Sequence, residues 1–124
     1  MSELGKIGWL DLTVPEAGKL RDFYTSVVGW SAESIDMGEY PDYAMKSSDG
    51  TGVCGVCHAR GPNADLPPMW IPYFLVTDLD GAVARLTASG GALIGEVRGM
   101  GGADRFCVFR DPAGAVAALY ERKK

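Results

Sequence analysis

The sequence predicts an α+β fold built from two tandem βαβββ modules, because the chain repeats itself and both halves have the same order of expected elements. Moving the first half along by sixty-two positions places residues 49–52 (Asp-Gly-Thr-Gly) on 111–114 (Asp-Pro-Ala-Gly) and Gly29 on Gly91. Replacing a turn glycine or an apolar core residue usually disrupts the fold, so such positions are retained in both copies of a repeat. One unit of about sixty residues therefore occurs twice.

The first module spans about residues 5–59. Residues 7–14 alternate with the two-residue period of a strand that has one face on a helix. Apolar side chains then recur at helical spacing from Ala17 to Tyr24, and Gly29 is suited to end a helix over 16–28. Three shorter strands complete the module, at 31–36, 42–47 and 53–58.

A polar, proline-rich linker over about 60–69 leads to the second module, at about 70–122. This module repeats the order of the first, so residues 1–124 are expected to form a single domain with mostly antiparallel pairing. Its expected elements are a strand at 70–76, a helix at 79–89 and strands at 92–97, 105–110 and 115–121.

Composition excludes several classes of function. The chain of 124 residues has 12 Lys and Arg against 16 Asp and Glu, without a run of like charge, so we expect no nucleic-acid partner. No apolar stretch approaches the ~20 residues of a membrane span, and the first residues lack an export signal. We therefore expect a cytoplasmic protein without a membrane partner. The chain has three cysteines, an odd number, so we expect reduced thiols.

Two short motifs carry a family resemblance that covers essentially the whole chain. Residues 23–30 (Phe-Tyr-Thr-Ser-Val-Val-Gly-Trp) close the first strand-helix run, and 111–114 form the last turn. In this order and spacing they resemble the glyoxalase / bleomycin resistance protein / dioxygenase superfamily, also called vicinal oxygen chelate proteins. The openings at 9–12 (Trp-Leu-Asp-Leu) and 70–73 (Trp-Ile-Pro-Tyr) are similar to a bacterial glyoxalase-like subgroup. The resemblance implies a sheet curled into a cup, a ligand site in the cup and a homodimer.

The resemblance also locates four positions at which metal-using members place ligands, on the first and last strand of each module. Here these positions are Trp9, Val56, Ile71 and Ala118, whose side chains have no lone pair for a divalent ion. A one-residue slip at a β-bulge changes one of these assignments, but the chain has one His in all. We therefore expect no metal site and no cofactor.

Residues 54–58 (Cys-Gly-Val-Cys-His) match the pattern of covalent haem attachment. The segment follows a turn into an expected strand, where residues three apart point to opposite faces. Cys54 and Cys57 then do not converge on a haem, a zinc ion or each other. They are expected to be small buried side chains.

Alternation along the strands gives the expected cup lining, which is apolar and aromatic as small-molecule sites usually are. Asp11, His58 and Tyr120 are candidate acid–base groups. Each has a structural alternative: Asp11 as a cap or the partner of an arginine, His58 as a solvated side chain, Tyr120 as a filler. The expected ligand pocket is Trp9, Asp11, Thr13, Cys54, Val56, His58, Ile71, Tyr73, Leu75, Val116, Ala118 and Tyr120.

Trp9 and Trp70 serve either as core and pocket wall or as a platform for a flat ligand. Residues 95–104 (Gly-Glu-Val-Arg-Gly-Met-Gly-Gly-Ala-Asp) lack a phosphate-loop ending, so a loop over the cup mouth is expected. Arg98 and Arg105 are placed either to meet an anionic ligand or in solvent.

Three functions remain open. The first is a metal-independent protein that sequesters a small apolar or aromatic molecule, as the resemblance to bleomycin resistance proteins implies. The second is a glyoxalase-like lyase or a dioxygenase-type enzyme, with or without metal. The third is a structural or regulatory module with no small ligand, favoured if the cup is filled by Trp9, Tyr73 and Tyr120.

Overall fold

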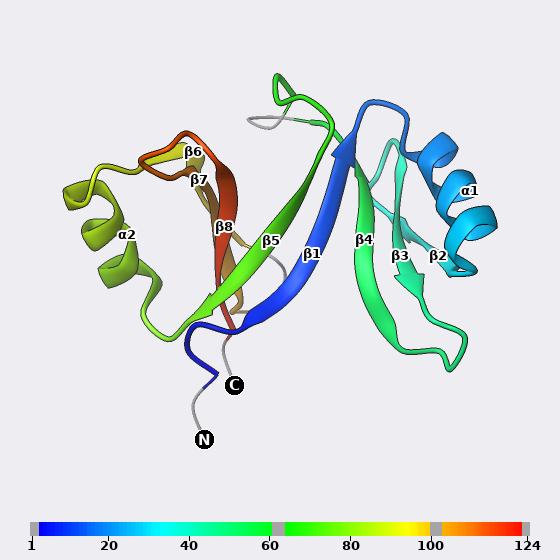
Figure 1. The fold of residues 1–124 in the computed structure, drawn as a ribbon, viewed down its shortest axis with the longest axis horizontal. Coiled ribbons are helices and arrows are strands. Elements are labelled where there is room, and N and C mark those ends of the chain that lie inside the picture. Colours follow the sequence, from blue (N-terminus) through cyan, green and yellow to red (C-terminus); the bar gives the residue numbers. More distant parts are fainter. Residues whose placement is uncertain (1–2, 61–63, 100–102, 123–124) are drawn as a thin grey trace. The chain divides into compact units, whose positions relative to one another are not determined.

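The computed structural model describes residues 3–60, 64–99 and 103–122. The chain divides into two compact units. We call Trp9–Trp70 the N-module, and the described residues before and after it the C-module. Each module is a four-stranded sheet with one helix on one of its faces (Figure 1).

In the N-module the strands lie in the order β2-β3-β4-β1. Strands β1 and β4 run parallel, and the β2–β3 and β3–β4 pairs are antiparallel. The elements are β1 (Ile7–Val14, of which the first two residues belong to the C-module), α1 (Ala17–Val28), β2 (Ser31–Asp36), β3 (Pro41–Lys46) and β4 (Gly52–His58).

The C-module repeats this plan with the strand order β5-β8-β7-β6, of which β5 and β8 are parallel. The segment before β1 joins it, since Gly5 N donates to Leu75 O and Leu75 N to Lys6 O, both at 2.8 Å. The elements are β5 (Met69–Val76, with its first two residues in the N-module), α2 (Leu79–Ala88), β6 (Ala92–Gly99), β7 (Arg105–Arg110) and β8 (Val116–Glu121).

The predicted α+β class, with two modules of the same element order, is confirmed. Most boundaries fall within one residue of those expected, because Gly29, Gly90 and the two hairpin turns end elements where the sequence suggested. Strand β6 is the exception. It runs to Gly99, so the first half of the expected loop over 95–104 is strand. Residues 100–102 lie outside the described part of the chain.

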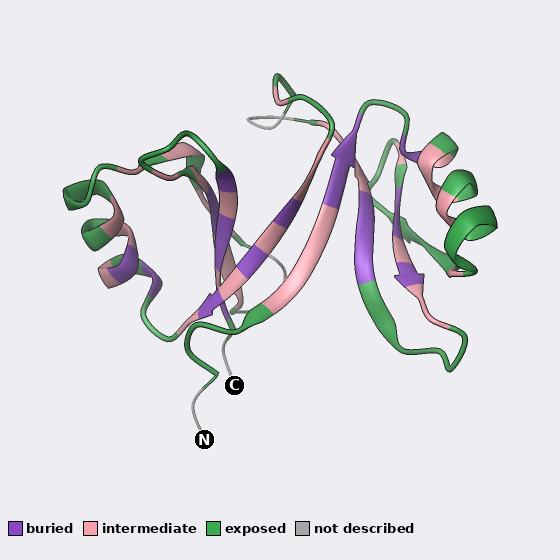
Figure 2. Cartoon of the chain, in the orientation of Figure 1, coloured by how far each residue is buried: buried purple, intermediate pink, exposed green. Residues whose placement is uncertain are grey.

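Each module has its core between its helix and its sheet. In the N-module, Leu12, Met45 and Val56 are at most 4% exposed and pack on the side of α1. In the C-module, Leu79, Cys107 and Leu119 pack on the side of α2. Burial alternates along β5 as it does when a strand has two different faces (Figure 2).

The two helices begin differently. Glu16 precedes α1 without a side-chain cap. Helix α2 has two acceptors at its start: Asp78 accepts from Gly81 N at 3.1 Å, and Glu121 from the end of β8 accepts from Leu79 N at 2.8 Å. These carboxylates satisfy backbone donors that the first helical turn leaves unpaired.

Candidate functional site

The sheet of the C-module has one face away from α2, which we call the helix-free face. Tyr73 lies opposite Ala118 and Leu75 opposite Tyr120, so these side chains share a face. The next residues along, Phe74 and Leu119, belong to the core on the α2 side. The six predicted lining residues of this module therefore fall on one face, as alternation predicts: Ile71, Tyr73, Leu75, Val116, Ala118 and Tyr120.

This face has a buried floor and a half-exposed upper layer. Ile71, Tyr73 and Ala118 are at most 5% exposed. Phe106 and Tyr120 are half-buried and lie opposite each other on β7 and β8. Tyr73 contacts Phe106, with 5.8 Å between ring centroids. The accessible part of the face is thus aromatic, resting on apolar side chains.

Phe106 was not expected in the lining, and the turn expected from the sequence would have placed it on the other face of the sheet. A hairpin closed by the turn at 111–114 places residues at equal distances from the turn opposite one another. Counted from the turn at 111–114, that rule puts Phe106 opposite Leu119. In the structure the loop also includes Ala115, so Phe106 lies opposite Tyr120 instead.

The Tyr120 hydroxyl donates to Asp104 Oδ2 at 2.8 Å, and the Arg122 guanidinium lies 5.4 Å from the centre of its ring. Burial, and then the bond to the Asp104 carboxylate, raise the pKa of Tyr120. The phenol is therefore protonated at neutral pH. In this state the Tyr120 hydroxyl is a neutral hydrogen-bonding group and a poor general base.

The two arginines beside the expected loop have different surroundings. Arg105 pairs with Glu121 at 3.1 Å and with Asp80 at 3.3 Å, so it is engaged within the module. Arg98 lies opposite Phe106 with its Cζ 4.7 Å from the ring centroid. Its Nε and Nη2 atoms are buried and have no hydrogen-bond partner among the described residues.

In the N-module, Trp9, Asp11 and Thr13 lie on the face opposite α1, beside Gly55 and Cys57. Trp9 Nε1 donates to Asp11 Oδ1 at 2.5 Å. A Cβ atom at Gly55 would collide with that carboxylate, so the pair lies directly over the glycine. The neighbouring indole of Trp9 is thus a partner of the Asp11 carboxylate.

The expectation that Cys54, Val56 and His58 share this face with Trp9 is wrong. Val56 lies opposite Leu12, and Cys54 and Val56 belong to the core on the α1 side. The cause is a β-bulge: the facing strand pairs Met45 with Cys54 but Lys46 with Gly52, which leaves Val53 extra. Beyond the bulge, alternation counted from the turn therefore assigns each side chain of β4 to the wrong face.

The bulge also moves one of the four family ligand positions. In the C-module the ligand position Ala118 lies opposite Tyr73. The counterpart of Tyr73 in the N-module is Asp11, which lies opposite Gly55. The ligand position on β4 is therefore Gly55 and not Val56. Trp9, Gly55, Ile71 and Ala118 still provide no donor atom, and these positions do not fit a metal ion. In the described parts of the chain, no three His, Cys, Asp or Glu gather to hold one elsewhere.

His58 is held by a buried carboxylate that the sequence did not single out. Asp42 is 8% exposed, accepts from His58 N at 2.9 Å and lies 3.3 Å from His58 Nδ1. The ring of Tyr40 meets the imidazole edge-on at 5.2 Å, and Arg60 lies 4.2 Å from the centre of the Tyr40 ring. The solvated alternative for His58 is therefore wrong. A lone Asp at the start of a strand is more typical of a turn, which is why Asp42 was missed.

Cys54 and Cys57 are free thiols on opposite faces of β4, as predicted. Burial, and then the charge of Asp11, raise the pKa of Cys54 to about 11. Burial is also the main reason that the pKa of Cys57 is raised. Neither is a thiolate at neutral pH, the form that binds metals and attacks electrophiles.

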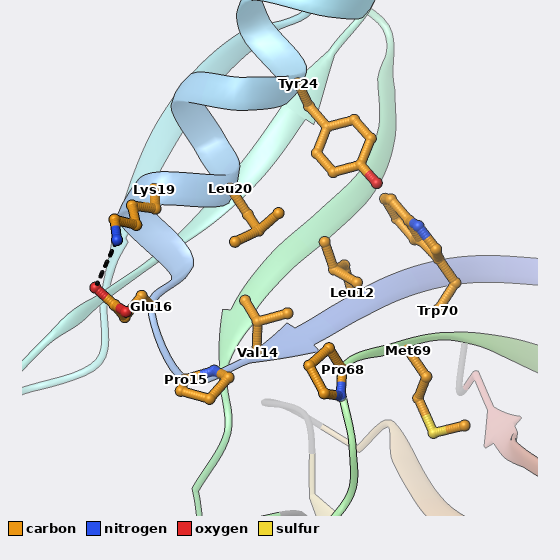
Figure 3. Close-up of a pocket in the computed structure, with 10 residues that line it drawn as sticks. All are labelled: Leu12, Val14, Pro15, Glu16, Lys19, Leu20, Tyr24, Pro68, Met69 and Trp70. Carbon is orange, nitrogen blue, oxygen red and sulfur yellow. Dashed lines mark ion pairs between the residues drawn. The ribbon is translucent and has the colours of Figure 1, made fainter.

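A pocket of about 400 Å³ lies on the α1 side of the N-module, between the start of the helix and the segment entering β5 (Figure 3). Lys19 and Glu16 form an ion pair at its edge, at 3.7 Å. The Tyr24 and Trp70 rings meet at its far wall, with 5.4 Å between centroids. Of the expected residues only Trp70, named as a possible wall, lines it. The lining is Leu12, Val14, Pro15, Glu16, Lys19, Leu20, Tyr24, Pro68, Met69 and Trp70.

The sequence profile of the Glyoxalase/Bleomycin resistance protein/Dioxygenase superfamily matches residues 6–119. The chain belongs to this superfamily. The resemblance of the two short motifs is thereby confirmed. None of the helices in the described parts of this superfamily member is both long and apolar enough to span a membrane.

Two curated relatives are similar over nearly the whole chain. The anthracycline biosynthesis protein DnrV of Streptomyces peucetius is 32% identical over 130 residues, 95% of this chain and 47% of the relative. The putative glyoxylase CFP32 of Mycobacterium tuberculosis is 28% identical over 122 residues, 97% of this chain and 47% of the relative. The chain thus spans about half the length of these relatives.

Solved structures share the fold at low identity. A variant of the Streptomyces coelicolor methylmalonyl-CoA epimerase, in complex with 2-nitronate-propionyl-CoA, has a TM-score of 0.64 at 15% identity, covering 98% of this chain and 99% of the epimerase. A hypothetical protein from Bacillus halodurans has a TM-score of 0.67 at 10% identity, covering 97% and 96%. At such identities the likeness establishes the glyoxalase-like fold.

Proposed function

We propose that this superfamily member binds a small apolar or aromatic organic molecule on the helix-free face of the C-module, without a metal ion at the family ligand positions. The observation that carries the proposal is the half-exposed aromatic pair of Phe106 and Tyr120 over a buried floor that includes Tyr73. A protein that shares the fold, the epimerase variant, is in complex with the organic molecule 2-nitronate-propionyl-CoA, which supports an organic ligand.

The chemistry of this face suits such a ligand. Half-exposed aromatic rings gain roughly 25 cal/mol for each Å² of apolar surface that a ligand removes from water. Flat ligands gain further from offset or edge-on ring contacts. The Tyr120 hydroxyl, held by Asp104, is the polar group that orients the bound molecule.

In the N-module the predicted residues Trp9, Asp11 and Thr13 share one face, and we propose this face as a candidate binding surface of its own. We also propose a homodimer in the cytoplasm. Helix α1 supports the homodimer, since Phe23, Val27 and Val28 on it are at least 50% exposed. Exposed apolar patches of this kind mark interfaces more often than isolated residues do.

A ligand screen tests the proposal. Aromatic and alicyclic compounds would be ranked by thermal shift, and the affinities of the hits measured by calorimetry for the wild type, Phe106→Ala and Tyr24→Ala. Both variants remove a half-buried ring, one from the helix-free face and one from the pocket beside α1. We expect Phe106→Ala to weaken binding about tenfold or more and Tyr24→Ala to leave it unchanged.

The opposite pattern would assign the ligand to the pocket beside α1. If no compound binds the wild type, the proposal is wrong and a structural role is favoured, in line with the burial of Tyr73. Elemental mass spectrometry of untagged protein, before and after incubation with Zn²⁺, Fe²⁺, Mn²⁺ and Ni²⁺, tests the metal claim. One tightly held ion per chain would contradict it.

The second candidate is a metal-free enzyme that uses His58 as acid and base, which the Asp42–His58 pair favours. A carboxylate at Nδ1 fixes the imidazole tautomer and leaves Nε2 for proton transfer. If a hit is consumed, His58→Gln should abolish turnover. Asp42→Asn, which keeps the shape, should lower kcat and shift its pH profile while leaving KM nearly unchanged. Full turnover by His58→Gln would exclude this role.

A further inference from the structure

We propose that Arg98 forms a carboxylate subsite on the helix-free face, so that the ligand is an organic acid with an apolar or aromatic body. This inference rests on the proposed function, whose ligand class it narrows. It starts from one side chain, whose Nε and Nη2 atoms are buried without a partner among the described residues.

The two atoms are the decisive detail. Nε–H and Nη2–H lie along one edge of the planar guanidinium and point the same way. This edge matches the two oxygens of a carboxylate, which accept two parallel hydrogen bonds. A single group of matching shape therefore satisfies both donors of Arg98, once the half-buried side chain turns this edge toward solvent.

Leaving both donors unpaired is costly, because a buried donor without an acceptor keeps its full desolvation penalty. No carboxylate among the described residues accepts from either atom. Asp104 accepts from Tyr120, and Glu121 is bonded to Arg105 and to the start of α2. The guanidinium therefore lacks an acceptor that the described residues do not provide, and a carboxylate of a bound molecule is a suitable one.

The position of Arg98 fits this role. It lies across from Phe106, which lies across from Tyr120, so the three side chains form a row over β6, β7 and β8. The guanidinium covers the Phe106 ring at 4.7 Å, a cation–π contact that holds its plane. A carboxylate at the guanidinium edge leaves the body of the same molecule beside the aromatic rings.

Benzoate is the probe, with benzamide as its neutral counterpart of the same shape and inorganic phosphate as the competing anion. Affinities would be measured at constant ionic strength for the wild type, Arg98→Met, Arg98→Lys and the control Arg110→Met, an exposed arginine on β7. Arg98→Met keeps an apolar chain of similar length, and Arg98→Lys keeps the charge but loses the two-donor edge.

We expect the wild type and Arg110→Met to prefer benzoate over benzamide about tenfold or more. Arg98→Met should bind both equally, and Arg98→Lys should fall between them. In a buffer without carboxylates, Arg98→Met should melt at the same temperature as the wild type or higher, since it removes unpaired buried donors. This result also shows that the variant folds.

Equal benzoate affinity in Arg98→Met and the wild type would overturn the subsite, as would tighter binding of phosphate than of benzoate. If benzamide still binds through Phe106 while benzoate has no advantage, the proposed function stands and the subsite fails. If neither compound nor any screened ligand binds the wild type, both fail.

Discussion

The last strands of the two modules, β4 and β8, differ by a single inserted residue. Along β7 and β8 the register is unbroken, from Arg105 opposite Glu121 to Arg110 opposite Val116. Between β3 and β4 the register shifts next to Met45, and Val53 is the extra residue. Because strand side chains alternate, one inserted residue exchanges the two faces for the rest of the strand.

The turns before these strands show how the repeat misleads. Gly50 N donates to Ser47 O at 2.9 Å, and Gly114 N donates to Asp111 O at the same distance. Both glycines have positive φ, +85° and +90°. The true counterpart of Asp111 is therefore Ser47, two residues before the Asp49 that the sequence repeat selects. The repeat therefore aligns the turn before β4 two residues too late. The extra residue of the bulge reduces this offset along β4 to one residue, which is enough to exchange the two faces of the strand.

A sequence repeat thus locates elements well and strand faces poorly. The effect of a mutation on β4 should therefore depend on the face that the bulged register assigns to the residue. On β8 it should depend on the face given by simple alternation.

The largest expected effect is that of a charge placed on the side of β4 assigned to the core. Val56 is fully buried, so Val56→Asp should destabilise the fold by more than about 4 kcal/mol or prevent folding. Val53, 37% exposed at the bulge, is the control, and Val53→Asp should change stability by at most about 0.5 kcal/mol. Urea denaturation measures both. A tolerated Val56→Asp would contradict the bulged register.

The ends of β4 and β8 also differ in what they do for the helices. Glu121 is 3% exposed and caps α2, whereas α1 begins at the exposed Glu16 without a side-chain cap. Glu121→Ala should cost about 2–4 kcal/mol, because it removes the acceptor of Leu79 N and the buried one of the two carboxylates that pair with Arg105. Glu16→Ala should cost about 0.5 kcal/mol or less. Similar losses for both variants in thermal unfolding would mean that the cap is unimportant.

A smaller effect is expected at Gly55, the counterpart in β4 of Ala118 in β8. A methyl group at Gly55 displaces Asp11 from its bond to Trp9, so Gly55→Ala should cost about 1–3 kcal/mol through overpacking. The indole Nε1–H signal of Trp9 should shift in NMR spectra of this variant. Asp11→Asn combined with Gly55→Ala should show non-additive stability. Purely additive losses would mean that the pair does not lie over Gly55.

The smallest effect is expected in the turn before β4. Bonds from the Ser47 hydroxyl and Thr51 N lower the pKa of Asp49 to about 2. A lowered pKa stabilises the fold above the ordinary carboxyl pKa near 4, and this contribution is lost as the pH falls toward 2. Ser47→Ala should therefore be less stable than the wild type at pH 7, with the gap closing near pH 2. A gap that is constant with pH would contradict the bond.

Much of the fold was predictable from local signals. Strand alternation, helical spacing and Gly29 indicated the element order, since each depends on a few neighbouring residues. In the C-module the lining of the helix-free face followed from alternation as well. Its register has no bulge next to β8.

The rest depends on contacts that local patterns do not contain. The bulge at Val53 is set by how β4 pairs with β3, and the bond from Asp42 to His58 joins positions sixteen residues apart. Arg98 was named as a possible ligand group, yet Arg105 had equal standing by sequence alone. The difference arises because Glu121 and Asp80 reach one arginine and not the other.

Chemical-shift mapping with benzoate on isotope-labelled protein tests the central claim most directly. We predict that the perturbed signals are the amides of Phe106 and Tyr120 and the side-chain Nε–H of Arg98, all on the helix-free face of the C-module. Perturbations confined to Tyr24, Trp70 and the pocket beside α1, or none at saturating benzoate, would contradict this prediction.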